Sequence, residues 1–210
     1  MIEVEVKLPI KNKEILEEAL AKKGFKKTSQ VCEEDMYFDN ASGQIRRGGE
    51  ALRIRKVTDL QTGKSQSVMT YKGKKLDAVS MSRRELETGV ADAQTCMGIF
   101  EALGFEMVPP VVKKKRQEYT LDNVNACVDQ VQGLGDFLEM EMVIEEKDNK
   151  EEALLQIEKM LESLGYRMED TTRSSYLSML QRKEAAARGE EKENWNYRKN
   201  FSNRSSFSQK

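Results

Sequence analysis

The chain has 210 residues, and its 35 lysine or arginine and 36 aspartate or glutamate side chains leave a net charge of −1. This balance argues against a protein that coats nucleic acid, although charged residues make up 34% of the chain, above the roughly 25% of an average globular domain. The absence of histidine excludes imidazole general bases, Ser-His-Asp triads and histidine-ligated zinc.

The cysteines and the apolar segments indicate the cellular compartment of the protein. Cys32, Cys96 and Cys127 are widely spaced and form no Cys-x-x-Cys motif, so neither a disulfide framework nor a thiolate zinc site is expected. No apolar stretch approaches the roughly 18 residues of a membrane span, and no secretory leader follows Met1. We therefore expect a cytoplasmic protein.

Strand-like segments dominate the sequence. Eight strands are predicted, at residues 2–8, 31–38, 50–57, 66–73, 79–88, 112–121, 124–131 and 137–145. The short links between several of them, such as residues 58–63, 122–123 and 132–136, favour antiparallel hairpins over crossover connections. The expected fold class is therefore α+β, built around one antiparallel sheet.

Apolar residues at helical spacing predict three helices, around residues 15–20, 96–103 and 154–164, and a shorter helix at 173–182. Each of the first three is followed by a glycine and an aromatic residue, in Gly24-Phe25, Gly104-Phe105 and Gly165-Tyr166. This order is typical of a helix that ends in a left-handed glycine and is followed by a hydrophobic contact.

The sequence changes character at about residue 184. Residues 184–210 are polar, lack sustained periodicity and are mildly basic, which is typical of a disordered tail. Trp195, Tyr197, Phe201 and Phe207 could dock to a partner, but a solvated tail is the simpler interpretation. We therefore expect one domain over residues 1–183 and a tail over residues 184–210.

Several strands carry charged side chains on one face. Pairs of like charge at positions i and i+2 are Glu3 and Glu5, Arg53 and Arg55, and Glu139 and Glu141. Other strands add Lys7, Lys72, Glu85, Glu87, Lys114, Arg116 and Asp129. For a single strand, a polar face in water is the ordinary explanation. Like charges this close repel by about 1 kcal/mol in water, and by more in a drier site. Repeated over several strands, the pairs indicate a surface that binds ligands.

Both kinds of pair suit a definite type of ligand. Paired carboxylates are hard oxygen donors for Mg²⁺ or Mn²⁺, whereas arginine and lysine side chains bind phosphate. Acids and bases on one concave surface therefore indicate a metal-bound polyphosphate. A closed eight-stranded barrel would place this face in its lumen and leave the apolar outer wall to the helices. The chain has no G-x-x-x-x-G-K-[ST] loop, so side chains have to hold the phosphates.

A series of motifs follows the same strands. They are Glu3-x-Glu5-x-Lys7, Tyr37-Phe38-Asp39, Leu52-Arg53-Ile54-Arg55, Thr70-Tyr71-Lys72, Arg84-Glu85-Leu86-Glu87, Lys114-Lys115-Arg116, residues 133–141 and residues 172–176. Their order resembles the CYTH domain, the family of triphosphate tunnel metalloenzymes that includes class IV adenylyl cyclases and thiamine triphosphatase. The resemblance covers residues 1–180 and leaves the tail out.

The resemblance implies an eight-stranded antiparallel tunnel that binds a triphosphate. Its substrate-binding residues would be Arg53, Arg55, Lys72, Lys114 and Arg116. Its ligands for one or two Mg²⁺ or Mn²⁺ ions would be Glu3, Glu5, Glu139 and Glu141, helped by Asp129, Glu85 or Glu87. Lys7 and Glu5 would be the catalytic residues, and Lys7 would orient the nucleophile or the phosphate beside the first metal site.

The leading hypothesis is an enzyme similar to class IV adenylyl cyclases, which convert ATP to cyclic AMP and pyrophosphate. The alternative is a triphosphatase that hydrolyses thiamine triphosphate, inorganic triphosphate or a nucleoside triphosphate. A binding module without chemistry and a scaffold with a solvated sheet face are rival hypotheses. The expected partner is a small triphosphate, with no membrane and no specific nucleic acid. The sequence leaves the oligomeric state open, a homodimer included.

Overall fold

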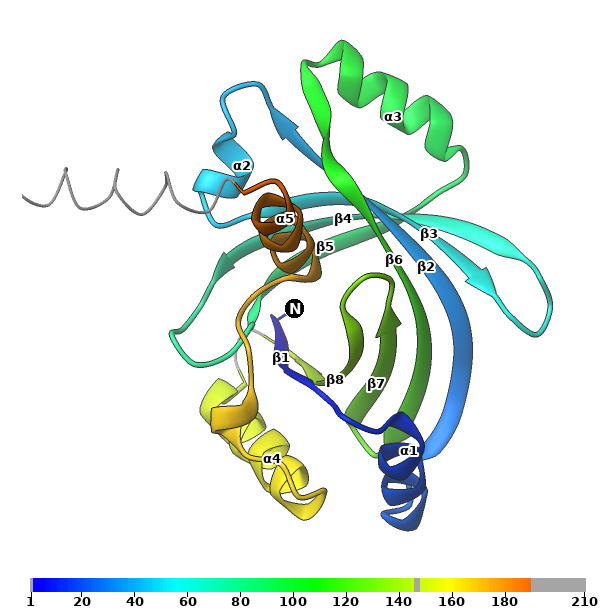
Figure 1. Cartoon of the computed structure of the whole chain (residues 1–210), viewed down its shortest axis with the longest axis vertical. Helices are drawn as coiled ribbons and strands as arrows, with labels where there is room; N and C mark the ends of the chain where they lie inside the picture. The colour runs from blue at the N-terminus through cyan, green and yellow to red at the C-terminus, as the bar shows by residue number, and fades with distance from the viewer. Residues whose placement is uncertain (1, 146–147, 190–210) are drawn as a thin grey trace, which may run out of the picture.

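The computed structural model describes residues 2–145 and 148–189, in which eight antiparallel strands close into a barrel (Figure 1). Around the barrel the strands follow the order β1-β5-β4-β3-β2-β6-β7-β8. They are β1 (Ile2–Pro9), β2 (Lys26–Asn40), β3 (Ala51–Asp59), β4 (Ser65–Lys75), β5 (Arg83–Val90), β6 (Phe105–Leu121), β7 (Val124–Val131) and β8 (Gly135–Ile144). The predicted fold, an α+β protein with a closed antiparallel barrel and helices outside it, is confirmed.

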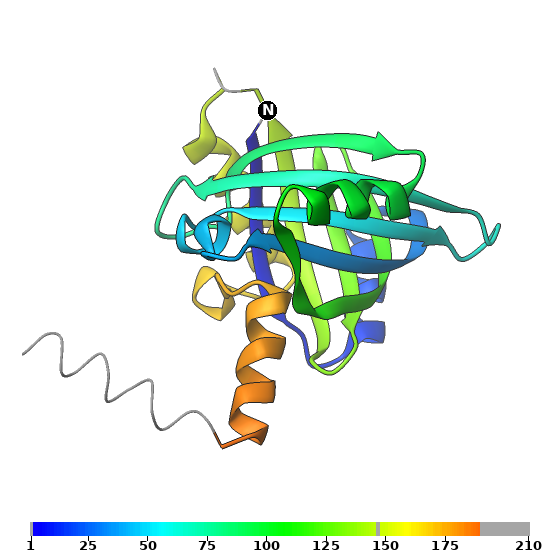
Figure 2. The same ribbon diagram turned by 90° about the horizontal axis from the view of Figure 1, so that it is seen from above.

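Two groups of strands cross each other in the barrel. Strands β2, β3, β4 and β5 run across the wall formed by β1, β7 and β8 (Figure 2). The long strand β6 joins the two groups, because it pairs with β2 along most of its length and with β7 through residues 114–121. This crossing encloses the space that holds the candidate site.

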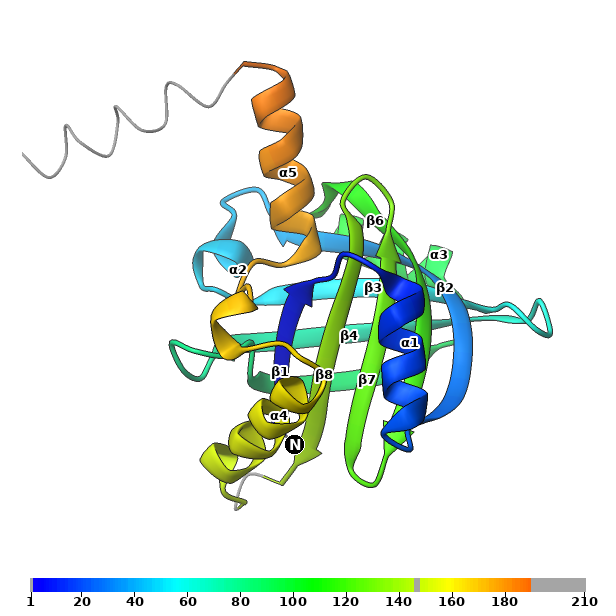
Figure 3. The same cartoon turned by 60° about the horizontal axis from the view of Figure 1, so that its bottom comes forward.

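The larger core lies outside the barrel, between the wall of β1, β7 and β8 and two helices. Alternation along each strand points the apolar side chains of this wall outward. Helices α1 (Lys13–Lys22) and α4 (Lys150–Ser163) cover them, and Leu16, Leu20, Ile157 and Leu161 are at most 2% exposed. Figure 3 shows both helices against this wall. Because the apolar side chains are buried there, the charged side chains of the same strands face the lumen.

The ends of the helices follow the local sequence. Asn12 and Asn149 cap the starts of α1 and α4 by accepting backbone N–H donors of the first turn. Gly24, Gly104 and Gly165 follow α1, α3 and α4 with φ of 93°, 81° and 84°, which confirms the predicted left-handed glycines.

The other two long helices lie elsewhere on the barrel. Helix α5 (Tyr176–Ala187) packs Tyr176 and Leu177 against Val112, Val131 and Phe137 at one end of the lumen. Helix α3 (Ala93–Ala102) contacts β6 and has no buried residue. None of the helices in the described part of the chain is long and apolar enough to cross a membrane.

Three elements differ from the prediction. Strand β5 begins at Arg83, later than expected, because the Asp77 carboxylate accepts the N–H groups of Val79 and Ser80 and turns the chain. The unpredicted short helix α2 (Gln44–Arg47) forms where the Asp39 carboxylate accepts two backbone N–H groups of its first turn. A second unpredicted element, the 3-10 helix η1 (Met168–Asp170), follows α4.

Several boundaries also lie elsewhere than predicted. Strand β2 begins at Lys26, five residues before the predicted start. Strand β6 begins at Phe105 because its register with β2 shifts between Asp35 and Tyr37 and lets pairing continue. Helix α5 runs past the expected boundary at residue 184 to Ala187, since glutamate and alanine favour helix there. Residues 190–210, most of the predicted tail, lie outside the described residues.

Candidate active site

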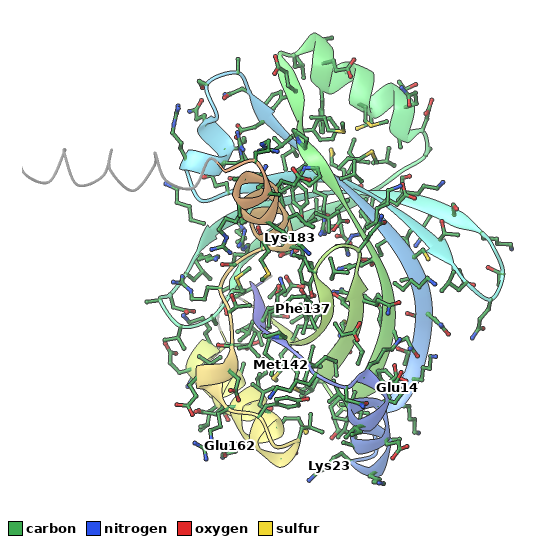
Figure 4. The ribbon with its side chains drawn as sticks, viewed as in Figure 1. Glu14, Lys23, Phe137, Met142, Glu162 and Lys183 are labelled. Carbon is green, nitrogen blue, oxygen red and sulfur yellow. The ribbon has the colours of Figure 1, made fainter. Side chains whose placement is uncertain are left out.

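The barrel encloses a cavity of about 820 Å³ that is lined mainly by charged side chains. Figure 4 shows oxygen and nitrogen atoms of side chains gathered inside the barrel near the labelled Phe137. A second cavity of about 690 Å³ shares Arg55, Glu87 and Glu118 with the first, so the lumen continues toward the β3–β4 hairpin. All the site residues predicted from the sequence line the first cavity except Asp129, which lies behind it in β7.

Two of the predicted phosphate-binding residues lie next to each other on β6. Arg116 donates two hydrogen bonds to Asp129, at 2.7 and 2.6 Å, and contacts Glu139. The Lys114 Nζ lies 3.3 Å from Asp129 and 3.0 Å from Glu33. These carboxylates hold both cations in the lumen wall, where each is only 5–6% exposed.

Arg53 and Arg55 of β3 face the same lumen. Arg55 donates to Asp35 through Nε and Nη2, at 2.5 and 2.9 Å, and its Nη1 lies 3.0 Å from Glu33. Arg53 donates to Thr70 and more weakly to Asp35. Its Nε is buried and has no hydrogen-bond partner among the described residues. This unused donor is available to a phosphate oxygen.

Glu33 and Asp35 are site residues that the sequence analysis missed. Both are at most 4% exposed, and both hold the arginines described above. Cations lower the pKa of Glu33 to about 2 and that of Asp35 below its usual range, against the opposing effect of burial. The sequence did carry a signal for them. Like the glutamate and arginine pairs of the other strands, Glu33 and Asp35 are like charges two residues apart in a predicted strand.

The strongest crowding of carboxylates lies where β1 meets β8. Glu5 is the direct cross-strand partner of Glu141, and Glu139 lies opposite Lys7. Burial and the charges of Glu3 and Glu5 raise the pKa of Glu141 to about 8. Burial and the charge of Glu139 also raise the pKa of Glu5. Among the described residues Glu141 forms no ion pair, and Glu5 has only Lys7, at 3.6 Å.

Lys7 is a cation of this cluster and is not placed to be a base. Its Nζ lies 2.8 Å from Glu139 and 4.1 Å from the centre of the Tyr176 ring. Although burial lowers the pKa of Lys7, the charges of Glu139 and Glu5 raise it above its ordinary value. Lys7 therefore stays protonated at neutral pH and can donate to a phosphate oxygen.

The remaining predicted carboxylates have different surroundings. Glu3 and Glu85 share Lys72, and burial together with the hydrogen bond that protonated Glu85 donates to Glu3 raises the pKa of Glu85 to about 8. Glu87 is exposed and accepts a hydrogen bond from Thr70. Asp129 is fully buried, and its carboxylate is already bound by two cations and the Tyr176 hydroxyl. This arrangement favours a positioning role for Asp129 over metal binding.

The carboxylates of β1 and β8 suit a hard divalent cation. In residues 2–145 and 148–189, no three acidic side chains form a ready-made cage for an ion. Glu5 and Glu141 nonetheless offer oxygen donors that the cations of the lumen leave largely unpaired. The pKa values of both carboxyl groups are raised, and a nearby cation would lower them again. The donor set therefore fits Mg²⁺ or Mn²⁺ held by a few carboxylates and completed by water and phosphate oxygens.

Known proteins are similar to this chain in sequence. A model of the CYTH domain matches residues 1–176. The chain belongs to the CYTH domain family. Members of this family process triphosphates and depend on a metal ion. One CYTH relative is a protein of Methanocaldococcus jannaschii named "Putative adenylate cyclase MJ0240", which is 37% identical over 179 residues, covering 85% of this chain and 98% of the relative.

Solved structures have the same barrel. The PH1819 protein of Pyrococcus horikoshii is 33% identical, with a TM-score of 0.77 over 86% of this chain and 99% of that one. A protein of Hippeastrum, described as a "putative adenylyl cyclase" with a dominant triphosphatase activity, has a TM-score of 0.63 at 18% identity, over 86% and 94% of the chains. At that identity the second likeness supports the fold alone.

Proposed function

We propose that this CYTH protein is a divalent-metal-dependent enzyme that acts on a triphosphate inside the barrel, and that it converts ATP to cyclic AMP and pyrophosphate. The observation that carries the proposal is the convergence of two chemistries on one cavity. Arginines and lysines from β3, β4 and β6 face the under-neutralised carboxylates of β1 and β8. A metal-bound triphosphate supplies the charges that both groups lack.

The cations of the lumen have the task of binding and orienting the phosphates. Ion pairs with Asp35 and Asp129 hold the side chains of Arg53, Arg55 and Arg116 in place, so these donors are ordered before a ligand binds. Such preorganised donors stabilise charge that develops on a transferring phosphoryl group. The Lys114 and Lys72 ammonium groups add point charges from the neighbouring strands.

The carboxylates of β1 and β8 would hold the metal. Glu5 and Glu141 would be its principal ligands, with Glu3 and Glu139 beside them. When bound, Mg²⁺ or Mn²⁺ neutralises phosphate charge and favours deprotonation of a coordinated hydroxyl. Lys7, next to Glu5 and Glu139, would orient the phosphate under attack.

In the cyclase reaction the ribose 3′-hydroxyl attacks the α-phosphorus in line with the leaving pyrophosphate. The hydroxyl proton passes to water, the bond between the α-phosphorus and the bridging oxygen breaks, and pyrophosphate leaves with the charge of that oxygen. The lumen cations would hold the phosphate chain fixed while the ribose turns toward the α-phosphorus. The adenylate cyclase name carried by the 37% identical relative supports this choice of reaction.

Hydrolysis of a triphosphate is the second candidate. Charged side chains line the cavity from β6 to the β4–β5 end, so phosphates alone can make most of the contacts. A substrate without a base or sugar, such as inorganic triphosphate, would be held by the same residues while water attacks the terminal phosphorus. The triphosphatase activity described for the Hippeastrum protein belongs to a fold of this kind.

Product analysis tests the proposal. Purified protein is incubated with ATP, inorganic triphosphate or thiamine triphosphate, each with Mg²⁺, with Mn²⁺ or with EDTA, and the products are separated by chromatography. The proposal expects metal-dependent cyclic AMP and pyrophosphate from ATP. Orthophosphate would favour the triphosphatase. Ligand-induced thermal stabilisation without any product would favour the hypothesis of a binding module. If the ligands did not stabilise the protein at all, the hypothesis of a structural scaffold would remain.

A further inference from the structure

Three cations that the sequence analysis did not select lie at one end of the main cavity. Lys75 ends β4, Arg83 begins β5, and Arg173 lies in the link between η1 and α5. All three line the cavity that contains Glu5 and Lys7. Arg83 lies two residues before the predicted ligand Glu85 in β5, so both side chains point to the lumen face of the strand.

These cations differ from the others in their partners. Lys75 donates to the carbonyl oxygen of Arg173, Arg83 to that of Met81, and Arg173 to those of Ser80 and Asp77. None of the three forms an ion pair with a carboxylate among the described residues. The cations deeper in the lumen, by contrast, each have at least one carboxylate partner.

The cluster concentrates positive charge at a partly buried place. Arg83 is only 8% exposed. Burial and the charges of Arg83 and Arg173 lower the pKa of Lys75 to about 8. A bound anion would relieve this repulsion, because opposite charges at short range favour the ionised form of each partner.

The backbone holds the cluster beside the metal-binding strand. Among the described residues, strands β1 and β5 pair only at Ile2 and Glu3. Beyond that point Met81 donates to the carbonyl of Glu5 at 2.8 Å, and Thr172 donates to the carbonyl of Lys7 at 2.7 Å. The segments that carry Arg83 and Arg173 are therefore fixed along the edge of β1.

The strand order then sets the position of the cluster relative to the metal ligands. Along the wall β4-β5-β1-β8-β7-β6, Lys75 and Arg83 come first, the carboxylates of β1 and β8 follow, and Lys114 and Arg116 come last. A phosphate chain that lies across these carboxylates would have cations at both ends.

We propose that Lys75, Arg83 and Arg173 form an additional anion-binding subsite that holds the phosphate group at the outer end of the triphosphate and distinguishes triphosphate from diphosphate ligands. The inference rests on the proposed function, because it assumes that the lumen binds a metal-bound phosphate chain. The deeper cations then hold the two inner phosphates. A diphosphate would occupy the deeper cations and leave the cluster empty.

Binding measurements test the subsite apart from turnover. Inorganic triphosphate and pyrophosphate are titrated calorimetrically into the full chain with Ca²⁺ replacing Mg²⁺, for the wild type, the double variant Lys75→Met/Arg83→Met and the control Lys74→Met. Lys74 is the exposed neighbour of Lys75 and does not line the cavity. We expect the double variant to weaken triphosphate binding by about tenfold or more and pyrophosphate binding by less than about twofold. The control should change neither.

Three results would overturn the subsite. Equal weakening of both ligands would mean that the cluster acts on the whole lumen, and unchanged triphosphate binding would mean that it binds no phosphate. A wild type that binds neither ligand would remove the proposed function together with the subsite. The single variant Lys75→Met guards against misfolding: its unliganded thermal midpoint should equal or exceed that of the wild type, because it removes a disfavoured charge.

Discussion

Glu5 of β1 lies directly opposite Glu141 of β8, so that a buried and a half-buried carboxylate face each other across neighbouring strands. Opposed positions of this kind bring side chains within about 5 Å. Neither carboxylate has a short ion pair among the described residues, and both pKa values are raised, that of Glu141 to about 8. Without a bound cation the pair therefore holds a proton at neutral pH, and a divalent cation has to displace it.

Binding of Mn²⁺ at pH 7 should release roughly one proton, because the metal competes with the proton of this carboxylate pair. Calorimetric titrations in buffers of different ionisation enthalpy measure the number. Replacing Glu141 by glutamine should weaken Mn²⁺ binding and abolish most of the release. A binding heat that does not depend on the buffer would contradict the account.

Stability without metal should fall as the pH rises from 5 to 8. Glu85 and Glu141 have folded-state pKa values of about 8, above the ordinary glutamate value of 4.5, so the folded chain binds more protons than the unfolded chain in this range. Their contribution is complete below about pH 4.5 and is lost as the pH rises through about 8. Urea denaturation in EDTA at several pH values measures it. The double variant Glu85→Gln/Glu141→Gln should flatten the profile, and a rising wild-type profile would count against these assignments.

Glu5→Gln should lower metal-dependent turnover at least ~100-fold while the fold is retained. The substitution removes a metal ligand and also one member of a repulsive pair, so the thermal midpoint of the unliganded protein should not fall. The matched control is Glu34→Gln, since Glu34 belongs to β2 but lines neither cavity. Turnover close to that of the wild type in Glu5→Gln would remove Glu5 from the metal site.

Asp129→Asn should destabilise the protein by about 3 kcal/mol, because it leaves buried Arg116 and Lys114 without their shared counter-charge. Urea denaturation measures the loss. The exposed Glu101→Gln of α3 is the control and should change stability by less than about 0.5 kcal/mol. If Asp129→Asn cost no more than the control, the rigid support proposed for Arg116 would not exist.

Turnover should have an alkaline optimum. The chain has no histidine to act as a base near neutral pH, and Lys7 stays protonated. Activity should therefore rise as the Glu5 and Glu141 pair loses its proton, and a higher Mn²⁺ concentration should shift this acidic limb to lower pH. A profile of kcat/KM against pH that peaks near pH 5 would contradict this reasoning.

Strand alternation was enough to predict most of the lumen. The parity of Glu3 and Glu5, of Arg53 and Arg55, and of Glu139 and Glu141 placed these side chains on one face, and all of them line the main cavity. Closure of the barrel came from the family resemblance together with the charge pattern, because pairing of β1 with β8 joins segments that are far apart in the sequence.

The partners of each charge could not be predicted in the same way. The contact of Arg116 with Asp129 depends on the register of β6 and β7, and a shift by one residue would send Asp129 out of the lumen. Arg173 reaches the cavity from an irregular link, where no periodicity exists to guide a prediction. The start of β5 was misplaced because the Asp77 turn is a side-chain effect.

The location of the metal and the triphosphate is the most direct test of the account. Crystals grown with Mn²⁺ and inorganic triphosphate allow anomalous diffraction at the manganese edge to place the ion. Manganese should lie between the carboxylates of Glu5 and Glu141, with phosphate oxygens against Arg53 and Arg116. Manganese and triphosphate bound only on the outside of the barrel would contradict it.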